Sequence, residues 1–170
     1  MKNKFFTMAI FAMGLATAAK AQNTATENTT TASAQIVVPI TISNGADLNF
    51  GSIVRSSSIG TVELAPDGTV TPTGVTMFTG SAAVATSAAA YTIAGEAGNT
   101  YVITLPANNA VVLSDGAGHS MQLTAFSHNA TGTFAASPET FQVGATLNIG
   151  ANQAAGNYVS DVFDVTVAYN

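Results

Sequence analysis

Gly156-Asn-Tyr-Val-Ser-Asp-Val-Phe-Asp-Val-Thr-Val-Ala-Tyr-Asn170 is the stretch of sequence that decides the fold. Apolar residues stand at every second position of its second half. This alternation is typical of a β-strand that buries one face in a core. We therefore expect one long strand over residues 156–170, with an inward face that consists of Phe163, Val165, Val167 and Tyr169.

A second alternating run lies near the other end of the sequence, where Ile36, Val38, Ile40 and Ile42 stand two residues apart. This run also predicts a strand with one buried face. Pro39 interrupts it and has no N–H to donate, so the strand is expected at a sheet edge or at a bulge. Ordered structure is expected to begin at about residue 34.

Short alternating runs separated by turn residues fill the rest of the chain. Turns are predicted at Pro66-Asp-Gly68, at residues 95–99 and at residues 114–118, and a further alternating strand at residues 141–149. The best helical candidate, the Ala-rich residues 82–90, lacks a large apolar face and is expected to be loop or strand. This pattern predicts an all-β fold, an antiparallel β-sandwich.

The first 21 residues have the composition of a secretory signal peptide. Lys2 and Lys4 precede an apolar run over residues 5–19, which is followed by Ala-Lys-Ala21. The run is shorter than the roughly 20 residues that a membrane span needs, so cleavage after Ala21 is expected and no stable membrane insertion. We expect a flexible polar leader at residues 22–33 and a single domain at residues 34–170.

The charge balance excludes several kinds of partner. Without the signal peptide the chain keeps one basic residue, Arg55, against nine acidic residues, a net charge of −8. Binding to nucleic acid requires clustered Lys and Arg, and docking on anionic lipid requires the same, so neither partner is expected.

The inventory of reactive side chains argues against catalysis. The sequence has no Cys, and His119 and His128 are the two candidate general bases outside the signal peptide. Both His residues are expected in exposed turns. Asp67 and Asp115 each precede a glycine, which favours turn formation over calcium binding. We predict a non-enzymatic protein without a cofactor or a metal site.

Several motifs occur in a fixed order over residues 34–170. They are Asp47-Leu-Asn-Phe-Gly-Ser-Ile53, Tyr101-Val-Ile-Thr-Leu-Pro106, Leu147-Asn-Ile-Gly-Ala-Asn-Gln-Ala-Ala-Gly156 and Val165-Thr-Val-Ala-Tyr169. With this set of motifs the chain resembles a family of secreted bacterial proteins known as a domain of unknown function, DUF4402.

The family is similar in layout to spore coat protein U and to the pilin subunits of chaperone-usher fimbriae. That similarity implies an immunoglobulin-like sandwich, a periplasmic chaperone and assembly with related subunits by β-strand addition. Gly156 and Tyr169 stand where pilins have a glycine and a penultimate aromatic residue. The leader at residues 22–33 is too polar to act as a donor strand. Either the run from Ile36 to Ile42 is the donor, or it closes its own sandwich.

Two functions follow as expectations. The first is a fimbria-like or coat-like structural subunit, secreted to the surface of a Gram-negative bacterium. Its assembly contacts would come from residues 34–42 and 159–169, because the near absence of Lys leaves strand edges unprotected. The alternative is a secreted monomeric module for carbohydrate binding or adhesion. It would need a concave patch of exposed aromatic rings, for which the candidates are Phe78, Tyr91, Tyr101 and Tyr158.

Overall fold

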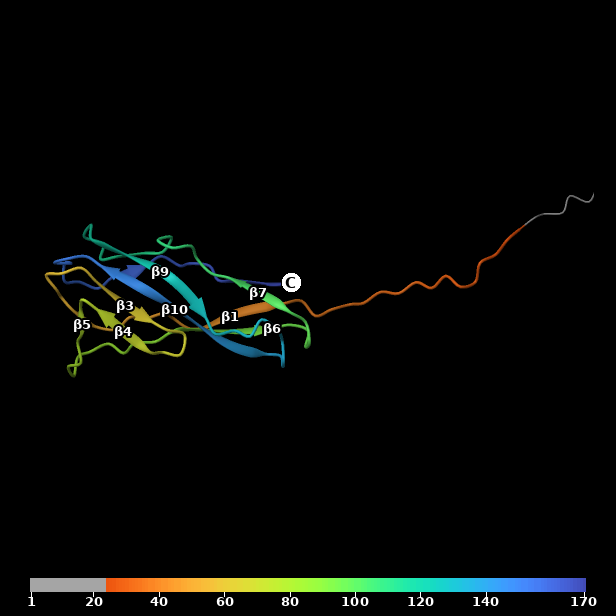
Figure 1. Cartoon of the computed structure of the whole chain (residues 1–170), viewed down its shortest axis with the longest axis horizontal. Helices are drawn as coiled ribbons and strands as arrows, with labels where there is room; N and C mark the ends of the chain where they lie inside the picture. Colours follow the sequence, from red (N-terminus) through yellow and green to blue (C-terminus); the bar gives the residue numbers. More distant parts are fainter. Residues whose placement is uncertain (1–23) are drawn as a thin grey trace, which may run out of the picture. The chain divides into compact units, whose positions relative to one another are not determined.

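A computed structural model of the chain describes residues 24–170 (Figure 1). The chain divides into two units, Met1–Gln35 and Ile36–Asn170. The described residues of the first unit, 24–35, have no regular secondary structure. The predicted signal peptide and the first two residues of the predicted leader lie outside the described residues.

Residues 24–170 form twelve β-strands and no helix. No helix that could cross a membrane is found among them. The strands are β1 (Thr41–Ala46), β2 (Ile53–Val54), β3 (Gly60–Leu64), β4 (Val70–Thr73), β5 (Thr76–Met77), β6 (Ala89–Ala94), β7 (Tyr101–Thr104), β8 (Val112–Ser114), β9 (Ser120–His128), β10 (Glu139–Ile149), β11 (Val159–Ser160) and β12 (Thr166–Tyr169).

The strands form one large sheet and two small ones. The large sheet has eight strands in the order β1-β6-β10-β9-β8-β11, and β3 and β4 join it through β10. One small sheet pairs β12 with β7, and the other pairs β2 with β5. All pairs are antiparallel, and the expected all-β antiparallel sandwich is confirmed.

β10 is the central strand of the large sheet, where Figure 1 shows it running beside β9 and β3. Along one edge it pairs first with β6 and then with β3, and along the other edge it pairs with β9. With partners on both edges, β10 buries the apolar residues predicted from the alternation, namely Phe141, Val143, Ala145, Leu147 and Ile149.

Two clusters of buried side chains form the core, and β10 contributes to both. The first cluster contains Leu147 and Ile149 together with Val62, Leu64 and Leu123. It is covered in part by the β2–β5 sheet, through Ile53 and Met77. The second cluster contains Ile93, Tyr101, Phe134, Phe141, Val143 and Val167, and it is covered by the β12–β7 sheet. The second layer of the sandwich is thus divided into two small pieces.

Two of the predicted turns close hairpins. Pro66-Asp-Gly68 joins β3 to β4, where the Asp67 carboxylate accepts the Thr69 N–H at 2.9 Å and Gly68 has a φ of 84°. Residues 115–119 join β8 to β9. Residues 95–100 instead connect strands of different sheets, since β6 belongs to the large sheet and β7 pairs with β12.

The prediction of a single long strand at residues 156–170 is wrong. The chain forms β11, which pairs with β8 in the large sheet, and then β12, which pairs with β7 in the small sheet. Residues 161–165 connect the large sheet to the small one. The chain therefore stops pairing with β8 after β11. Asp161 and Val162 are consequently exposed, while the predicted inward positions from Phe163 to Tyr169 do turn toward the core.

The strand predicted from residue 34 begins later, at Thr41. The register explains the difference, because Thr41 pairs with Ala94, the last residue of β6. Residues before Thr41 have no strand beside them. Ile40 and Ile42 pack on the second core cluster, whereas Ile36 and Val38 are exposed. The expected edge position is confirmed, since β1 ends the order of the large sheet and has a bulge between Asn44 and Ala46.

Candidate functional site

Three consecutive apolar residues, Ile36, Val37 and Val38, are exposed and lie two residues before β1; we call them the exposed segment. Ile36 is 97% exposed and Val38 is 52% exposed. β1 itself has one hydrogen-bonded neighbour among the described strands, β6. Isolated exposed apolar residues are ordinary on a protein surface, but a contiguous group beside an open strand edge is characteristic of an interaction site.

The exposed segment is fastened to the domain at Val38. The Tyr169 hydroxyl donates a hydrogen bond to the Val38 carbonyl at 2.7 Å and accepts one from the Glu96 N–H, also at 2.7 Å. The Val38 N–H donates to the Glu96 carboxylate at 3.3 Å. The penultimate Tyr169, half-buried against Phe134, therefore joins the end of β12 to the residues that precede β1.

A groove lies over the first core cluster and has a volume of about 1010 Å³. Leu123, Leu147 and Ile149 contribute to its lining. Exposed valines also line it, and we call it the valine groove; they are Val54, Val84, Val159 and Val162. Val162 is 100% exposed and Val159 is 62% exposed. The groove therefore includes the start of the predicted assembly region at residues 159–169.

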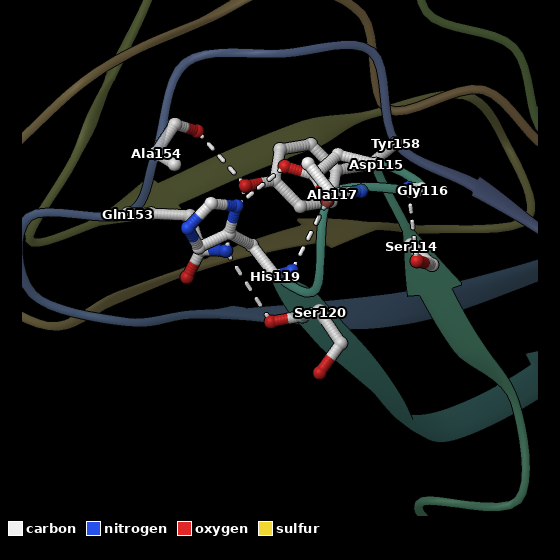
Figure 2. A network of polar contacts seen from close by, with 9 residues as sticks. All are labelled: Ser114, Asp115, Gly116, Ala117, His119, Ser120, Gln153, Ala154 and Tyr158. Carbon is white, nitrogen blue, oxygen red and sulfur yellow. Dashed lines mark hydrogen bonds and ion pairs between the residues drawn. The ribbon is translucent and has the colours of Figure 1, made fainter.

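A network of polar contacts beside the valine groove fixes the residues that precede β11 (Figure 2). The Tyr158 hydroxyl donates to the Ala154 carbonyl and accepts from the Gln153 amide, each at 2.9 Å. Gly156 lies in a bend between Ala154 and Tyr158, and a Cβ added there would come no closer than 3.4 Å to Asp115. Steric crowding therefore does not require a glycine at this position.

Asp115 and His119 contact each other in the same network. The Asp115 carboxylate lies 2.6 Å from the His119 ring nitrogen and accepts the backbone N–H groups of Ala117 and His119. Burial of this carboxyl opposes its ionisation, but the hydrogen bonds outweigh burial and hold the pKa of Asp115 below its ordinary value. The predicted role of Asp115 as a turn residue is confirmed.

The four aromatic residues proposed for carbohydrate binding do not form a common exposed patch. Tyr101 is buried and donates its hydroxyl proton to Glu139, while Tyr91 is half-buried and stacks on Phe141. Burial first, and then the hydrogen bond to Glu139, raise the pKa of Tyr101. Tyr158 is also half-buried, which leaves Phe78 as the exposed ring of the four.

The remaining chemical candidates lie apart. His119 and His128 are both exposed, as expected, but only His119 lies in a turn, since His128 is the last residue of β9. His119 immediately precedes β9 and His128 ends it, so the nine-residue strand separates them and they do not form one site. Among residues 24–170 no group of three or more His, Asp or Glu side chains could hold a metal ion. The valine groove and the hydrogen bonds among Val38, Glu96 and Tyr169 were not predicted from the sequence. The residues in these hydrogen bonds are 58 to 131 positions apart, and the groove is lined by several separate segments.

Comparisons with known proteins place the chain in a family. Searches of curated proteins and of solved structures return no match. A family model does match, over residues 40–169, and its description is "Domain of unknown function (DUF4402)". The match covers β1 to β12, the complete β-structure described above. The resemblance seen in the sequence motifs is therefore confirmed, and the chain belongs to the DUF4402 family.

Proposed function

We propose that this protein is a non-enzymatic structural subunit of the bacterial surface, exported through the periplasm and assembled by β-strand addition. One observation carries the proposal: the exposed segment, Ile36–Val38, leads into β1, whose second edge has no strand partner among the described strands. An apolar stretch of backbone without a strand partner is suited to pair with the sheet of another molecule.

The valine groove is the surface that best fits the partner segment. It combines exposed valines with two short strands, β2 and β11, each of which has one hydrogen-bonded neighbour among the described strands. The exposed segment of the same chain lies before the start of β1, whereas the groove includes Asn44 near the end of β1. Asn44 lies about 10 Å along the strand from Thr41, and the exposed segment continues from Thr41 in the opposite direction, so it is poorly placed to fill its own groove.

Charge also favours pairing through this part of the chain. Residues 34–42 contain no charged side chain, although the described domain carries a large excess of acidic residues. Two copies would therefore repel each other across most of their surfaces but not along this segment. β1 contains neither Lys nor Arg, the side chains that commonly protect a strand edge.

The two interpretations of the Ile36 to Ile42 run can now be combined. Ile40 and Ile42 pack on the domain's own core, so this half of the run completes its own sandwich. The side chains of Ile36 and Val38 remain exposed, and this half of the run is the proposed donor. During export a periplasmic chaperone would cover the same exposed residues.

An Ile36→Asp variant tests the proposal in the secreted protein. Burying an isoleucine side chain contributes about 1.5–3 kcal/mol, so placing a carboxylate there should weaken association about 10-fold or more. Thr26→Asp is the matched control, because it adds the same charge to the polar leader. Size-exclusion chromatography and electron microscopy should show oligomers for the wild type and the control, and monomers for Ile36→Asp. A wild type that stays monomeric at every concentration would contradict the proposal.

A further inference from the structure

Both polar backbone groups of Val38 are occupied within its own chain. The Tyr169 hydroxyl binds its carbonyl oxygen at 2.7 Å, and the Glu96 carboxylate binds its N–H at 3.3 Å. Addition of a strand to a sheet requires free N–H and C=O groups, since these form the ladder with the new partner. Val38 is therefore unable to join a second sheet while these contacts persist.

The opposite side of the same segment is also a poor partner. Along an extended chain the backbone N–H and C=O groups of successive residues point to alternate sides. The groups of Val37 and Pro39 therefore point to the side opposite those of Val38. Pro39 has no N–H to contribute. One side of the segment is thus held by Tyr169 and Glu96, and the other keeps the N–H of Val37 but has no donor at Pro39.

The geometry around Tyr169 is closely fitted. Its hydroxyl also accepts the Glu96 N–H at 2.7 Å, and its ring meets Phe134 edge to face with the ring centroids 6.2 Å apart. At Gly95 an added Cβ would lie 2.7 Å from the Tyr169 hydroxyl and 2.6 Å from the Phe134 ring. Only glycine leaves room for the hydroxyl at the point where it reaches Val38.

We propose that Tyr169 and Glu96 form an autoinhibitory latch, which holds Val38 to its own domain and must open before the exposed segment pairs with a second copy. The proposal rests on the proposed function for its consequence, although the latch itself is a contact within one chain. It gives Tyr169 a positioning role, because the hydroxyl acts through the backbone of Val38 and does not itself contact the partner.

The Tyr169→Phe variant removes the hydroxyl and keeps the ring that packs on Phe134. Loss of a hydrogen bond of ordinary strength should accelerate amide hydrogen exchange at Val38 roughly two- to tenfold and accelerate assembly by a similar factor. Tyr158→Phe is the matched control, since that hydroxyl also has two hydrogen-bond partners, Gln153 and Ala154, but lies beside β11. The control should leave exchange at Val38 unchanged.

Glu96 supplies a second, graded test. Glu96→Gln keeps an oxygen that can accept the Val38 N–H and should behave nearly as the wild type does. Glu96→Ala removes the acceptor and should increase exchange at Val38 and the assembly rate. A general loss of stability would raise exchange throughout β10 as well, so the amides of β10 report whether the effect is local.

The outcomes separate the latch from the proposed function. Unchanged exchange at Val38 in Tyr169→Phe overturns the latch. Faster exchange with an unchanged assembly rate overturns the inhibitory role, while assembly of the wild type still supports the proposed function. Faster exchange in a protein that never assembles, with or without the substitution, sinks the proposed function and with it the regulatory part of the inference.

Discussion

Two parts of the chain share an alternating apolar pattern but differ in burial. One is residues 36–42, the exposed segment and the start of β1, and the other is residues 163–169, which end in β12. Phe163, Val165, Val167 and Tyr169 all turn toward the core. In the other run Ile40 and Ile42 turn inward, while Ile36 and Val38 are exposed. The pattern alone therefore does not decide burial.

The difference lies in the neighbouring strands. Val167 pairs with Ile103 of β7, and both contribute to the second core cluster. Residues before Thr41 extend beyond the end of β6 and have no ladder there; Ile40 still packs on the second core cluster, whereas Ile36 and Val38 are exposed. Alternation indicates which side of a strand is apolar, and burial additionally requires a partner strand at that point of the sheet.

The largest expected effect comes from placing one charge in each run. Val167→Asp puts a carboxylate at a position that is 9% exposed and should lower the free energy of unfolding by about 3 kcal/mol or more. Ile36→Asp should change it by less than about 0.5 kcal/mol, because the side chain is already in water. Urea denaturation of both variants measures the contrast. Equal losses of unfolding free energy would show that the Ile36 side chain is buried in solution. The two runs would then not differ in burial.

A smaller effect is expected from crowding the end of β12. Gly95→Ala should lower the free energy of unfolding by about 1–3 kcal/mol, because the new methyl group overlaps Phe134 and the Tyr169 hydroxyl. Gly156→Ala is the control; its Cβ would make ordinary contacts, so it should be neutral or stabilise by up to about 1 kcal/mol. Thermal and urea unfolding distinguish the two. A tolerated Gly95→Ala would show that Tyr169 is loosely held.

The sequence predicts the local features of this fold well. Alternation over residues 141–149 identifies β10, and Pro66-Asp-Gly68 identifies the turn between β3 and β4. These predictions succeed because the determining interactions are close in sequence. The inward side of residues 163–169 is predicted for the same reason, although β12 itself covers only residues 166–169.

The features that require distant partners could not be predicted. The division of the last strand depends on β8 and β7 lying in different sheets, and the exposure of Ile36 depends on where β6 ends. The latch joins Val38, Glu96 and Tyr169, which no spacing rule connects. For the candidate site the sequence therefore indicated the participating segments but not which of their residues are available.

Pro39→Val separates two explanations for the exposed segment. If the end of β6 is the cause, a restored N–H at residue 39 has no acceptor strand, and hydrogen exchange at residues 36–38 should remain as in the wild type. Stability should fall by about 0.4–1 kcal/mol, because the unfolded chain gains freedom. Ile40→Val, also adjacent to β1 but unrelated to proline, is a suitable control for packing. New protection of residues 36–38 would instead assign the exposure to Pro39.

The smallest expected effect concerns Asp115, whose polar network holds the residues that precede β11. Because the folded pKa of Asp115 is below its unfolded value, its contribution to stability is present above the unfolded pKa, near 4, and is lost as the pH falls through the folded pKa. Asp115→Asn keeps an acceptor for the Ala117 N–H but removes the charge. The stability difference between wild type and variant should therefore shrink as the pH falls below about 4. A difference that does not change with acid would mean that the Asp115 charge contributes nothing, and that β11 is held by the Tyr158 hydrogen bonds and its pairing with β8.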